Sequence, residues 1–246
     1  MGILNLYTLE RDDTMARLTC KVSEVFTSIQ GEGPLLGTPA IFVRLATCNL
    51  RCPWCDTRYA WQQGRIEPIK TLLARVDSML SSASAWLVVV TGGEPLLQQD
   101  CVINVCGFAQ RRGALCAIET NGVIGPSPRL LTVVDHVVVS PKLSNSFWGG
   151  TGSPEKAAVN YEWFRVYHST AMGVKIYWKF VVGSPRDLRE VDDFVASHHL
   201  QPKDVFLMPL STTVEEQLKL LPLLVGHALR RGYRVTPRLH MLASVR

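Results

Sequence analysis

Three closely spaced cysteines constrain this chain more than any other feature. Cys48, Cys52 and Cys55 follow the spacing C-x3-C-x2-C in the segment TCNLRCPWCDT. Three thiolates this close in sequence can converge on one metal centre, whereas an iron–sulfur cube normally takes four cysteine ligands. Three ligands leave one iron open, and an open metal position is where substrate or cofactor chemistry occurs. The spacing therefore predicts a 4Fe–4S cluster with a reactive iron.

The remaining cysteines favour a cluster over structural zinc or a disulfide framework. Structural zinc usually shows two ligand pairs, and the second pair is missing here. Cys101, Cys106 and Cys116 are scattered among apolar residues and Cys20 begins a strand-like run, so we expect all four to be small buried hydrophobic residues. Seven cysteines is an odd number and the start of the chain lacks a secretory apolar region, so disulfides are not expected. Zinc, or no metal, stays open as the alternative.

Length, charge and hydropathy narrow the class of protein. A chain of 246 residues with 47% hydrophobic content can form one domain of the (β/α)-barrel size. No apolar run reaches the ~18 residues that a membrane span needs. The net charge of +5 is not gathered into a basic run, and an anionic small substrate explains it as well as a nucleic acid does. Because cluster thiolates need a reducing compartment, we expect a cytoplasmic protein.

Strand-like runs alternate with helical patterns, which predicts βα units and a mostly parallel sheet. Helical patterns cover Pro68–Ser81, Pro185–His198 and Thr213–Arg231, and the last of these opens with a capping box. Pro222 is expected to kink or split that helix. The expected strands are Thr19–Ser28, Ala40–Leu45, Trp86–Val90, Leu115–Glu119, His136–Ser140, Val174–Val182 and Asp204–Met208, with Arg234–Arg238 as a candidate last strand.

The same patterns suggest one domain. Residues 1–18 form an expected N-terminal extension, and residues 19–246 form the domain. The stretch 143–171 shows no clear period and is expected to be a long loop or insertion. Long loops inside compact domains often act as lids.

A glycine-rich turn follows one of the buried strands. The segment Thr91-Gly92-Gly93-Glu94-Pro95 by itself predicts only a turn with a proline at a helix start. Glycines allow the backbone to approach a ligand closely, and the ends of parallel strands are where barrel enzymes place their sites. The Glu94 carboxylate or nearby carbonyl groups could therefore hold an ammonium group.

The segment Phe26–Trp61 resembles the N-terminal region of the 7-carboxy-7-deazaguanine synthases, a family of radical S-adenosylmethionine (radical SAM) enzymes. The resemblance covers residues 19–142 well and the rest loosely. The combination of QGEG with CDT is more discriminating than the cysteines, which the whole superfamily shares. The matching features are, in order, Ile29-Gln30-Gly31-Glu32-Gly33, Arg44, the three cysteines with Asp56-Thr57, TGGEP, Glu119-Thr120-Asn121-Gly122, Ser140-Pro141-Lys142 and Lys179-Phe180-Val181-Val182.

The resemblance implies both a fold and a reaction. The fold would be an α/β, abbreviated (β/α) partial TIM barrel of about six parallel strands, with the cluster loop at the C-terminal face of the strands. The reaction would be that of a magnesium-dependent lyase, which contracts the ring of 6-carboxy-5,6,7,8-tetrahydropterin to 7-carboxy-7-deazaguanine and releases ammonia. It serves queuosine and 7-deazapurine biosynthesis. A 5′-deoxyadenosyl radical from S-adenosylmethionine would do the chemistry, so no protein side chain is expected to be catalytic.

The resemblance also gives roles to the matching positions. The cluster would be held by Cys48, Cys52 and Cys55, and magnesium by Thr57. Residues expected to bind S-adenosylmethionine are Gly93, Glu94, Glu119, Ser140, Pro141 and Lys142. Residues expected to bind the pterin are Ile29, Gln30, Gly31, Glu32, Arg44, Thr91 and His240.

Several of these roles have a simpler alternative. The Arg44 guanidinium suits a substrate carboxylate, and its apolar neighbours make an unpaired charge there costly, although it could be a surface strand arginine. Thr57 is a weak magnesium ligand that substrate oxygens and water would have to complete, and Asp56-Thr57 could instead cap a turn. Glu119 could be a helix-cap partner, and His240 an ordinary surface histidine.

Two other classes of protein stay open. An activating enzyme for glycyl-radical reductases would share the cysteines and GGEP, and a non-catalytic module would hold zinc. The expected partners are the pterin, an electron donor such as flavodoxin or ferredoxin, and a second copy in a homodimer that covers an open barrel edge. Neither a membrane nor a nucleic acid is expected to bind directly.

Overall fold

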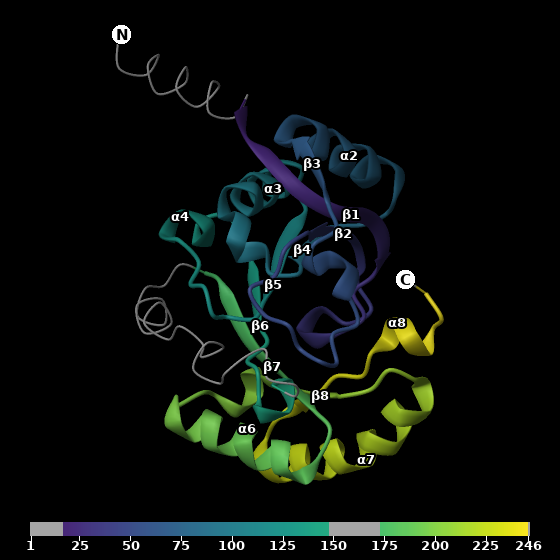
Figure 1. Cartoon of the computed structure of the whole chain (residues 1–246), viewed down its shortest axis with the longest axis vertical. Coiled ribbons are helices and arrows are strands. Elements are labelled where there is room, and N and C mark those ends of the chain that lie inside the picture. Colours follow the sequence, from purple (N-terminus) through teal and green to yellow (C-terminus); the bar gives the residue numbers. More distant parts are fainter. Residues whose placement is uncertain (1–16, 148–172, 246) are drawn as a thin grey trace.

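The computed structural model describes residues 17–147 and 173–245 (Figure 1). Within these residues one sheet has nine strands in the order β3-β1-β2-β4-β5-β6-β7-β8-β9. The strands are β1 (Thr19–Ile29), β2 (Pro39–Leu45), β3 (Arg65–Pro68), β4 (Leu87–Gly92), β5 (Leu115–Thr120), β6 (His136–Val139), β7 (Lys175–Val182), β8 (Val205–Pro209) and β9 (Arg234–Val235). The α-helices are α2 (Ile69–Ser82), α3 (Gln99–Arg111), α4 (Pro128–Leu131), α6 (Pro185–Ser197), α7 (Val214–Arg231) and α8 (Leu239–Leu242). Residues 1–16 of the predicted extension and 148–171 of the predicted loop lie outside the described residues.

β2 and the six strands from β4 to β9 run parallel, and β1 and β3 are antiparallel additions at one edge. β2 pairs with β4, and each later strand pairs with the next one along the chain, all in parallel. β1 is antiparallel to both β2 and β3. Helices lie between successive parallel strands, as in βα units. The predicted abbreviated (β/α) barrel is confirmed. β3 was not predicted, because its four residues, RIEP, carry no strand pattern.

Alternate residues of each strand separate the two faces of the sheet. Val88 and Val90 of β4 belong to the large core that the helices complete, whereas Leu87 and Val89 belong to a smaller cluster with Phe42 on the opposite face. Strands that are buried on both faces appear in the sequence as continuous apolar runs. The opposite face is the interior of the barrel, where the site lies.

The helix α7 forms with the predicted boundaries but without the predicted break. Thr213 caps it through a capping box with Glu216, and Gly232 ends it at φ +76°. Pro222 lies inside one continuous helix, so the predicted split is wrong. The buried face of the helix, which includes Leu224 and Ala228, packs on the large core, and tertiary packing supplies most helix stability.

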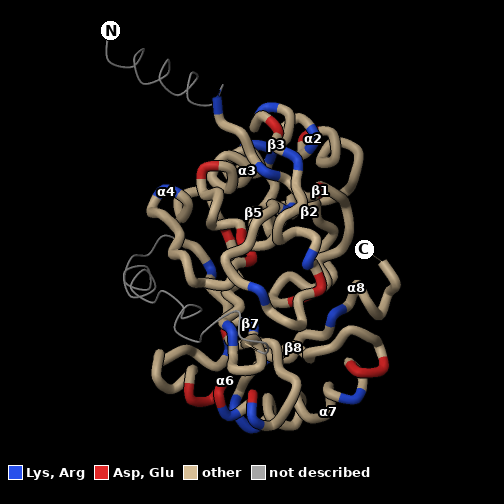
Figure 2. The backbone as a smooth tube through the Cα atoms, in the orientation of Figure 1, with Lys and Arg blue, Asp and Glu red and all other residues tan. Residues whose placement is uncertain are grey.

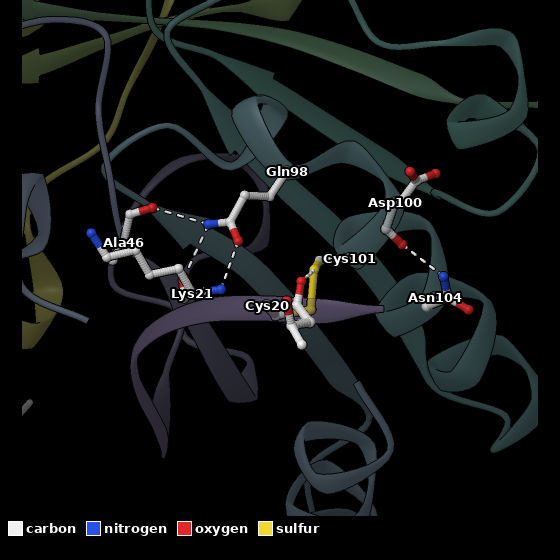
Figure 3. The surroundings of a disulfide bond; sticks show 8 residues. Cys20, Lys21, Ala46, Gln98, Asp100, Cys101 and Asn104 are labelled. Carbon is white, nitrogen blue, oxygen red and sulfur yellow. Dashed lines mark hydrogen bonds between the residues drawn. A yellow bond between two sulfur atoms is a disulfide. The ribbon is translucent and has the colours of Figure 1, made fainter. Parts of the chain in front are cut away.

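Four cysteines form two disulfides, which corrects the prediction that they are unpaired hydrophobic residues. Cys20 at the start of β1 is bonded to Cys101 in α3, with their Cα atoms 5.9 Å apart (Figure 3). Cys106 is bonded to Cys116, with a Cα–Cα distance of 5.3 Å. All four are buried, as predicted, but the fold brings each pair together. An odd number of cysteines means only that at least one is unpaired, so it does not exclude two disulfides.

The C-terminal segment closes the open side of the barrel. Figure 1 shows α8 beside the β1–β2 side of the molecule. The backbone N–H of Leu239 donates to the carbonyl of Gly31 at 2.8 Å, and that of Gly33 donates to Thr236 Oγ1 at 2.7 Å. The gap between the two ends of the sheet is thus bridged from within this chain. None of the described helices is both long and apolar enough to span a membrane.

Candidate active site

Polar side chains lie on the interior face of the barrel at the C-terminal ends of the strands. The alternation that places Phe42 and Val89 inside also places Arg44 and Thr91 there, one step further along β2 and β4. Glu119 ends the interior face of β5 in the same way. A cavity of about 400 Å³ lies at this C-terminal end of the strands, where barrel enzymes carry their sites.

The cavity brings together all but two of the predicted site residues. Glu94 and Pro141 are not part of its wall. The predicted residues that line it are Cys48, Cys52, Cys55, Thr57, Ile29, Gln30, Gly31, Glu32, Arg44, Thr91, Gly93, Glu119, Ser140, Lys142 and His240.

The three cysteines of the loop after β2 are unpaired thiols. Because both disulfides use the other four, these three of the seven cysteines are available to bind a metal centre. Burial raises the pKa of Cys48 to about 11 and also raises that of Cys52. Metal binding requires thiolates, so binding a cluster here would release protons.

The cluster loop is seated on the glycine turn that follows β4. A Cβ atom at Gly92 would lie on the backbone of Leu45, and one at Gly93 would lie on Thr47 and Cys48. Thr47 itself has a φ of 84°, which is rare for a β-branched residue and is a strained conformation of the kind that clusters at functional sites. The two glycines therefore let the turn pack against the start of the cluster loop.

Among the described residues, no three His, Cys, Asp or Glu side chains converge as they would around a single metal ion. The three thiols instead line one wall of a cavity. An iron–sulfur cube binds its cysteines through several different irons, so three thiols that line one cavity can serve as its ligands.

Glu94 supports the site from behind. Its carboxylate is fully buried and accepts hydrogen bonds from the backbone N–H groups of Leu96 at 3.0 Å and Asn121 at 2.8 Å, and from Thr120 Oγ1 at 2.8 Å. Burial raises its pKa, although these bonds favour the charged form. The carboxylate ties the turn after β4 to the end of β5 and does not face the cavity.

Arg44 forms an ion pair with a carboxylate of the protein. The sequence argument that its charge would be unpaired without a ligand is therefore wrong. The Nε atom of Arg44 lies 2.8 Å from Glu24 Oε1, which also accepts from the Tyr59 hydroxyl at 2.8 Å. The guanidinium lies over the ring of Phe26, 5.9 Å from the centroid. Because a guanidinium carries five N–H donors, this pairing leaves donors for a ligand.

Lys142 is a second cation of the cavity. Its ammonium donates to Ser140 Oγ at 2.8 Å and lies 5.2 Å from the ring centroid of Trp54, which stands between two of the loop cysteines. Burial lowers its pKa. The loop and the end of β6 thus meet at this lysine.

Glu32 lies in an ion network that the sequence did not predict. Lys179 Nζ is 2.6 Å from Glu32 Oε2 and 3.8 Å from Glu119 Oε1, and Arg238 Nε is 3.2 Å from Glu32 Oε1. Arg238 also pairs with Asp56 of the cluster loop. Lys179 belongs to a segment that matches the family, but the resemblance gave it no role; a lysine within the apolar strand KIYWKFVV is the signal that could have marked it.

His240 and Thr57 also line the cavity. His240 packs so closely on Gly31 that a Cβ atom there would collide with its ring. Burial lowers the pKa of His240, so the imidazole is neutral at neutral pH. Thr57 Oγ1 lies 3.6 Å from Cys55 Sγ, and both atoms belong to residues of the cavity wall.

Comparison with known proteins places this site in a family. The radical SAM superfamily model matches residues 43–137. The 7-carboxy-7-deazaguanine synthase of Pyrobaculum aerophilum is 39% identical over 225 residues, which cover 91% of this chain and 94% of that protein. The enzyme of the same name from Hyperthermus butylicus is 37% identical over 233 residues, covering 92% and 93%.

A solved structure supports the fold. The crystal structure of QueE from Escherichia coli superposes with a TM-score of 0.65 at 23% identity, and covers 98% of this chain and 100% of that chain. Membership of the superfamily implies a 4Fe–4S cluster and S-adenosylmethionine, and three unpaired cysteines in the cavity wall fit such a cluster. From its cysteine loop and from relatives that match it almost end to end, the chain belongs to the 7-carboxy-7-deazaguanine synthases of the radical SAM superfamily.

Proposed function

We propose that the protein converts 6-carboxy-5,6,7,8-tetrahydropterin to 7-carboxy-7-deazaguanine and ammonia, as a magnesium-dependent lyase of 7-deazapurine biosynthesis. One observation carries the proposal: a single cavity contains the cysteine loop together with Gln30, Glu32, Arg44 and Glu119. The cysteines alone fit any radical SAM enzyme. The other four residues give a cavity suited to a small polar ring that carries a carboxylate.

The cofactors have matching residues in the cavity wall. Cys48, Cys52 and Cys55 would hold the cluster, and Gly93 and Ser140, which line the same cavity, would bind S-adenosylmethionine. When bound, the two groups supply the 5′-deoxyadenosyl radical. Thr57 would contribute one ligand to magnesium, with substrate oxygens and water completing the coordination.

The protein binds and orients the substrate. Gln30, Glu32 and Glu119 offer acceptors to the N–H groups of the pterin, and Arg44 offers N–H donors to its carboxylate. Apolar groups such as Phe42 would cover the faces of the ring and exclude water. Holding the reacting groups close in this way is the main contribution a protein makes when a cofactor supplies the chemistry.

The partners and location follow from the same function. An electron donor such as flavodoxin or ferredoxin would reduce the cluster in the cytoplasm, where the three ligand cysteines stay reduced and the two disulfides are buried. We also propose a homodimer that pairs through α7, because Leu218, Val225 and Leu229 on that helix are exposed at 54%, 42% and 82%. Basic and acidic residues are interspersed along the described chain (Figure 2), and the small pterin, not a nucleic acid, is the proposed ligand.

The test is an anaerobic assay. The protein is reconstituted with iron and sulfide, reduced, and supplied with S-adenosylmethionine, magnesium and 6-carboxytetrahydropterin, and the product is followed by ultraviolet absorbance and mass. We expect the deazaguanine carboxylate to form, to be lost in Cys52→Ala, and to fall in Thr57→Ala. If 5′-deoxyadenosine forms without pterin conversion, the assignment to the radical SAM superfamily stands and the proposed substrate is wrong. If the protein retains zinc and forms no cluster, the proposal that the three cysteines bind a 4Fe–4S cluster is wrong.

A further inference from the structure

We propose that Lys179 is a positioning residue, which fixes Glu32 and Glu119 as a pair of hydrogen-bond acceptors in the cavity wall. The inference rests on the proposed function, because it states how that site recognises an edge rich in N–H donors. Lys179 itself need not touch the substrate. Its role is to set the charge state and the direction of two groups that do.

Lys179 reaches both carboxylates from one side. It occupies an interior position of β7, and its ammonium lies 2.6 Å from Glu32 and 3.8 Å from Glu119. The Lys179 side chain is only 7% exposed. An ammonium has three donors and no acceptor, so one buried group can bridge the two carboxylates.

Each carboxylate is also held from a second direction. Arg238 binds the other oxygen of Glu32 at 3.2 Å, and its own position is fixed by the carbonyl of Ser211 at 2.8 Å. Glu119 accepts from Gln30 Nε2 at 3.1 Å and from Thr91 Oγ1 at 3.0 Å. Each carboxylate oxygen has two lone pairs, so these contacts fix the groups while leaving acceptor capacity for a ligand.

The charge of Lys179 decides what the pair can recognise. Two carboxylates that share a site without a cation between them hold one proton in common, since both cannot ionise at close range. A protonated carboxyl is a donor and would face the N–H donors of the proposed substrate. With Lys179 in place, Glu32 and Glu119 can both act as acceptors.

The surroundings of Glu32 agree with this assignment. Burial would raise the pKa of Glu32, but the charges of Lys179 and Arg238 outweigh it and hold the pKa at about 2. Burial also opposes the charge on Lys179, yet Glu119 and Glu32 raise its pKa. The charged and titratable groups around Glu32 are Lys179 of β7, Glu119 of β5, Asp56 of the cluster loop, and Arg238 and His240 of the C-terminal segment.

The experiment compares Lys179→Met with Lys179→Arg in the reconstituted holoenzyme. Lys175→Met is the matched control, because Lys175 is an exposed lysine of the same strand. We expect Lys179→Met to raise KM for the pterin by about tenfold or more, the size expected for a lost charge-assisted bond. The kcat/KM of this variant should also fall as the pH is lowered from alkaline values to neutral, whereas kcat/KM of the wild type and of the control should not change over that range. Lys179→Arg should restore the flat profile.

The alternative is that Lys179 only stabilises the fold. Lys179→Met would then lower the midpoint of thermal unfolding while leaving KM and the pH profile unchanged, and that result would overturn the inference. If Lys179→Met does not fold, Glu119→Gln/Lys179→Met removes one carboxylate together with the cation. We expect the double variant to keep a flat profile, because Glu32 then has no second carboxylate with which to share a proton. A profile that still falls toward neutral pH would overturn the inference.

Failure of the proposed function gives a different signature. If the wild type does not convert the pterin, the function is wrong, but the role of Lys179 remains measurable by carbon-13 NMR of glutamate-labelled protein, with Glu32→Gln to assign the signal. The Glu32 carboxylate should titrate far below neutral pH in the wild type and nearer to neutrality in Lys179→Met. Identical titration in both proteins would overturn the inference by itself.

Discussion

Single residues of the site differ in how far the sequence can predict them. The three cysteines and Arg44 carry their chemistry in their type and local spacing. Lys179 and Arg238 do not, because each becomes informative only beside Glu32, which lies 147 and 206 residues away along the chain. Such long-range ion pairs come from the fold and leave no local pattern.

The ion network around Glu32 predicts a dependence of stability on pH. Glu32 has a pKa of about 2 in the folded protein and an ordinary value of 4.5, so its pairing stabilises the fold fully above pH 4.5 and ceases to do so as pH falls toward 2. The shift corresponds to about 3 kcal/mol. We expect Glu32→Gln in the cluster-free protein to lower the free energy of unfolding by about that amount at pH 7, and by much less near pH 3.

Urea unfolding at several pH values measures this dependence. Asp193→Asn is the control, because Asp193 is exposed on α6 and has no ion pair in the described structure. Its effect should be small at every pH. An effect of Glu32→Gln that stays constant between pH 7 and pH 3 would show that the charge of Glu32 does not stabilise the fold.

Elements were predictable where their pattern is local. The parallel strands appear as apolar runs, and α7 is marked by a capping box and a terminal glycine. The four residues of β3 were missed because they form a strand only by pairing with the start of β1. The disulfides were missed for a related reason: Cys20 and Cys101 are 81 residues apart and meet only because α3 packs beside β1.

The two disulfides predict a thiol count and a difference in stability. Denatured, non-reduced protein should titrate with three thiols, and reduced protein with all seven. In the loop-entropy model the Cys20–Cys101 bond, which spans 81 residues, contributes about 4.5 kcal/mol, and the Cys106–Cys116 bond, which spans 10, about 3 kcal/mol. We therefore expect Cys20→Ala/Cys101→Ala to lower the unfolding temperature more than Cys106→Ala/Cys116→Ala does.

Both double variants should still bind the cluster, since its ligands lie elsewhere. The Cys20–Cys101 bond is nevertheless connected to the cluster loop through Gln98, three residues before Cys101 (Figure 3). Gln98 accepts from Lys21 N–H at 2.7 Å and donates to the Ala46 carbonyl at 3.0 Å, close to the cluster loop. Thiols should therefore be counted before cluster reconstitution. Seven thiols in the non-reduced protein would contradict both bonds.

At the scale of the molecule, the barrel closes within the chain, so a second copy is not needed to cover its gap. The C-terminal segment bridges to the loop after β1 through Leu239 and Thr236. The exposed apolar surface instead points to α7, where Leu218, Pro222, Val225 and Leu229 are exposed at spacings of four, three and four residues. That spacing is typical of a helix that packs along another helix.

The ends of α7 make an antiparallel pairing of two copies self-complementary. Its first turn carries Glu215 and Glu216, and its last turn carries Arg230 and Arg231. A two-fold axis near the middle of the helix would bring the acidic end of one copy to the basic end of the other, as an isologous interface requires. The apolar stripe would lie between these charges.

This pairing predicts which substitution produces a monomer. We expect the wild type to elute as a dimer by size-exclusion chromatography with light scattering, and Leu229→Glu to elute as a monomer that keeps its cluster. Ile66→Glu is the control, because Ile66 is 68% exposed on the edge strand β3. It should leave the dimer intact, since a charge on that edge does not touch α7. If Ile66→Glu dissociates the dimer and Leu229→Glu does not, the copies pair through the β3 edge, and the stripe on α7 has another role.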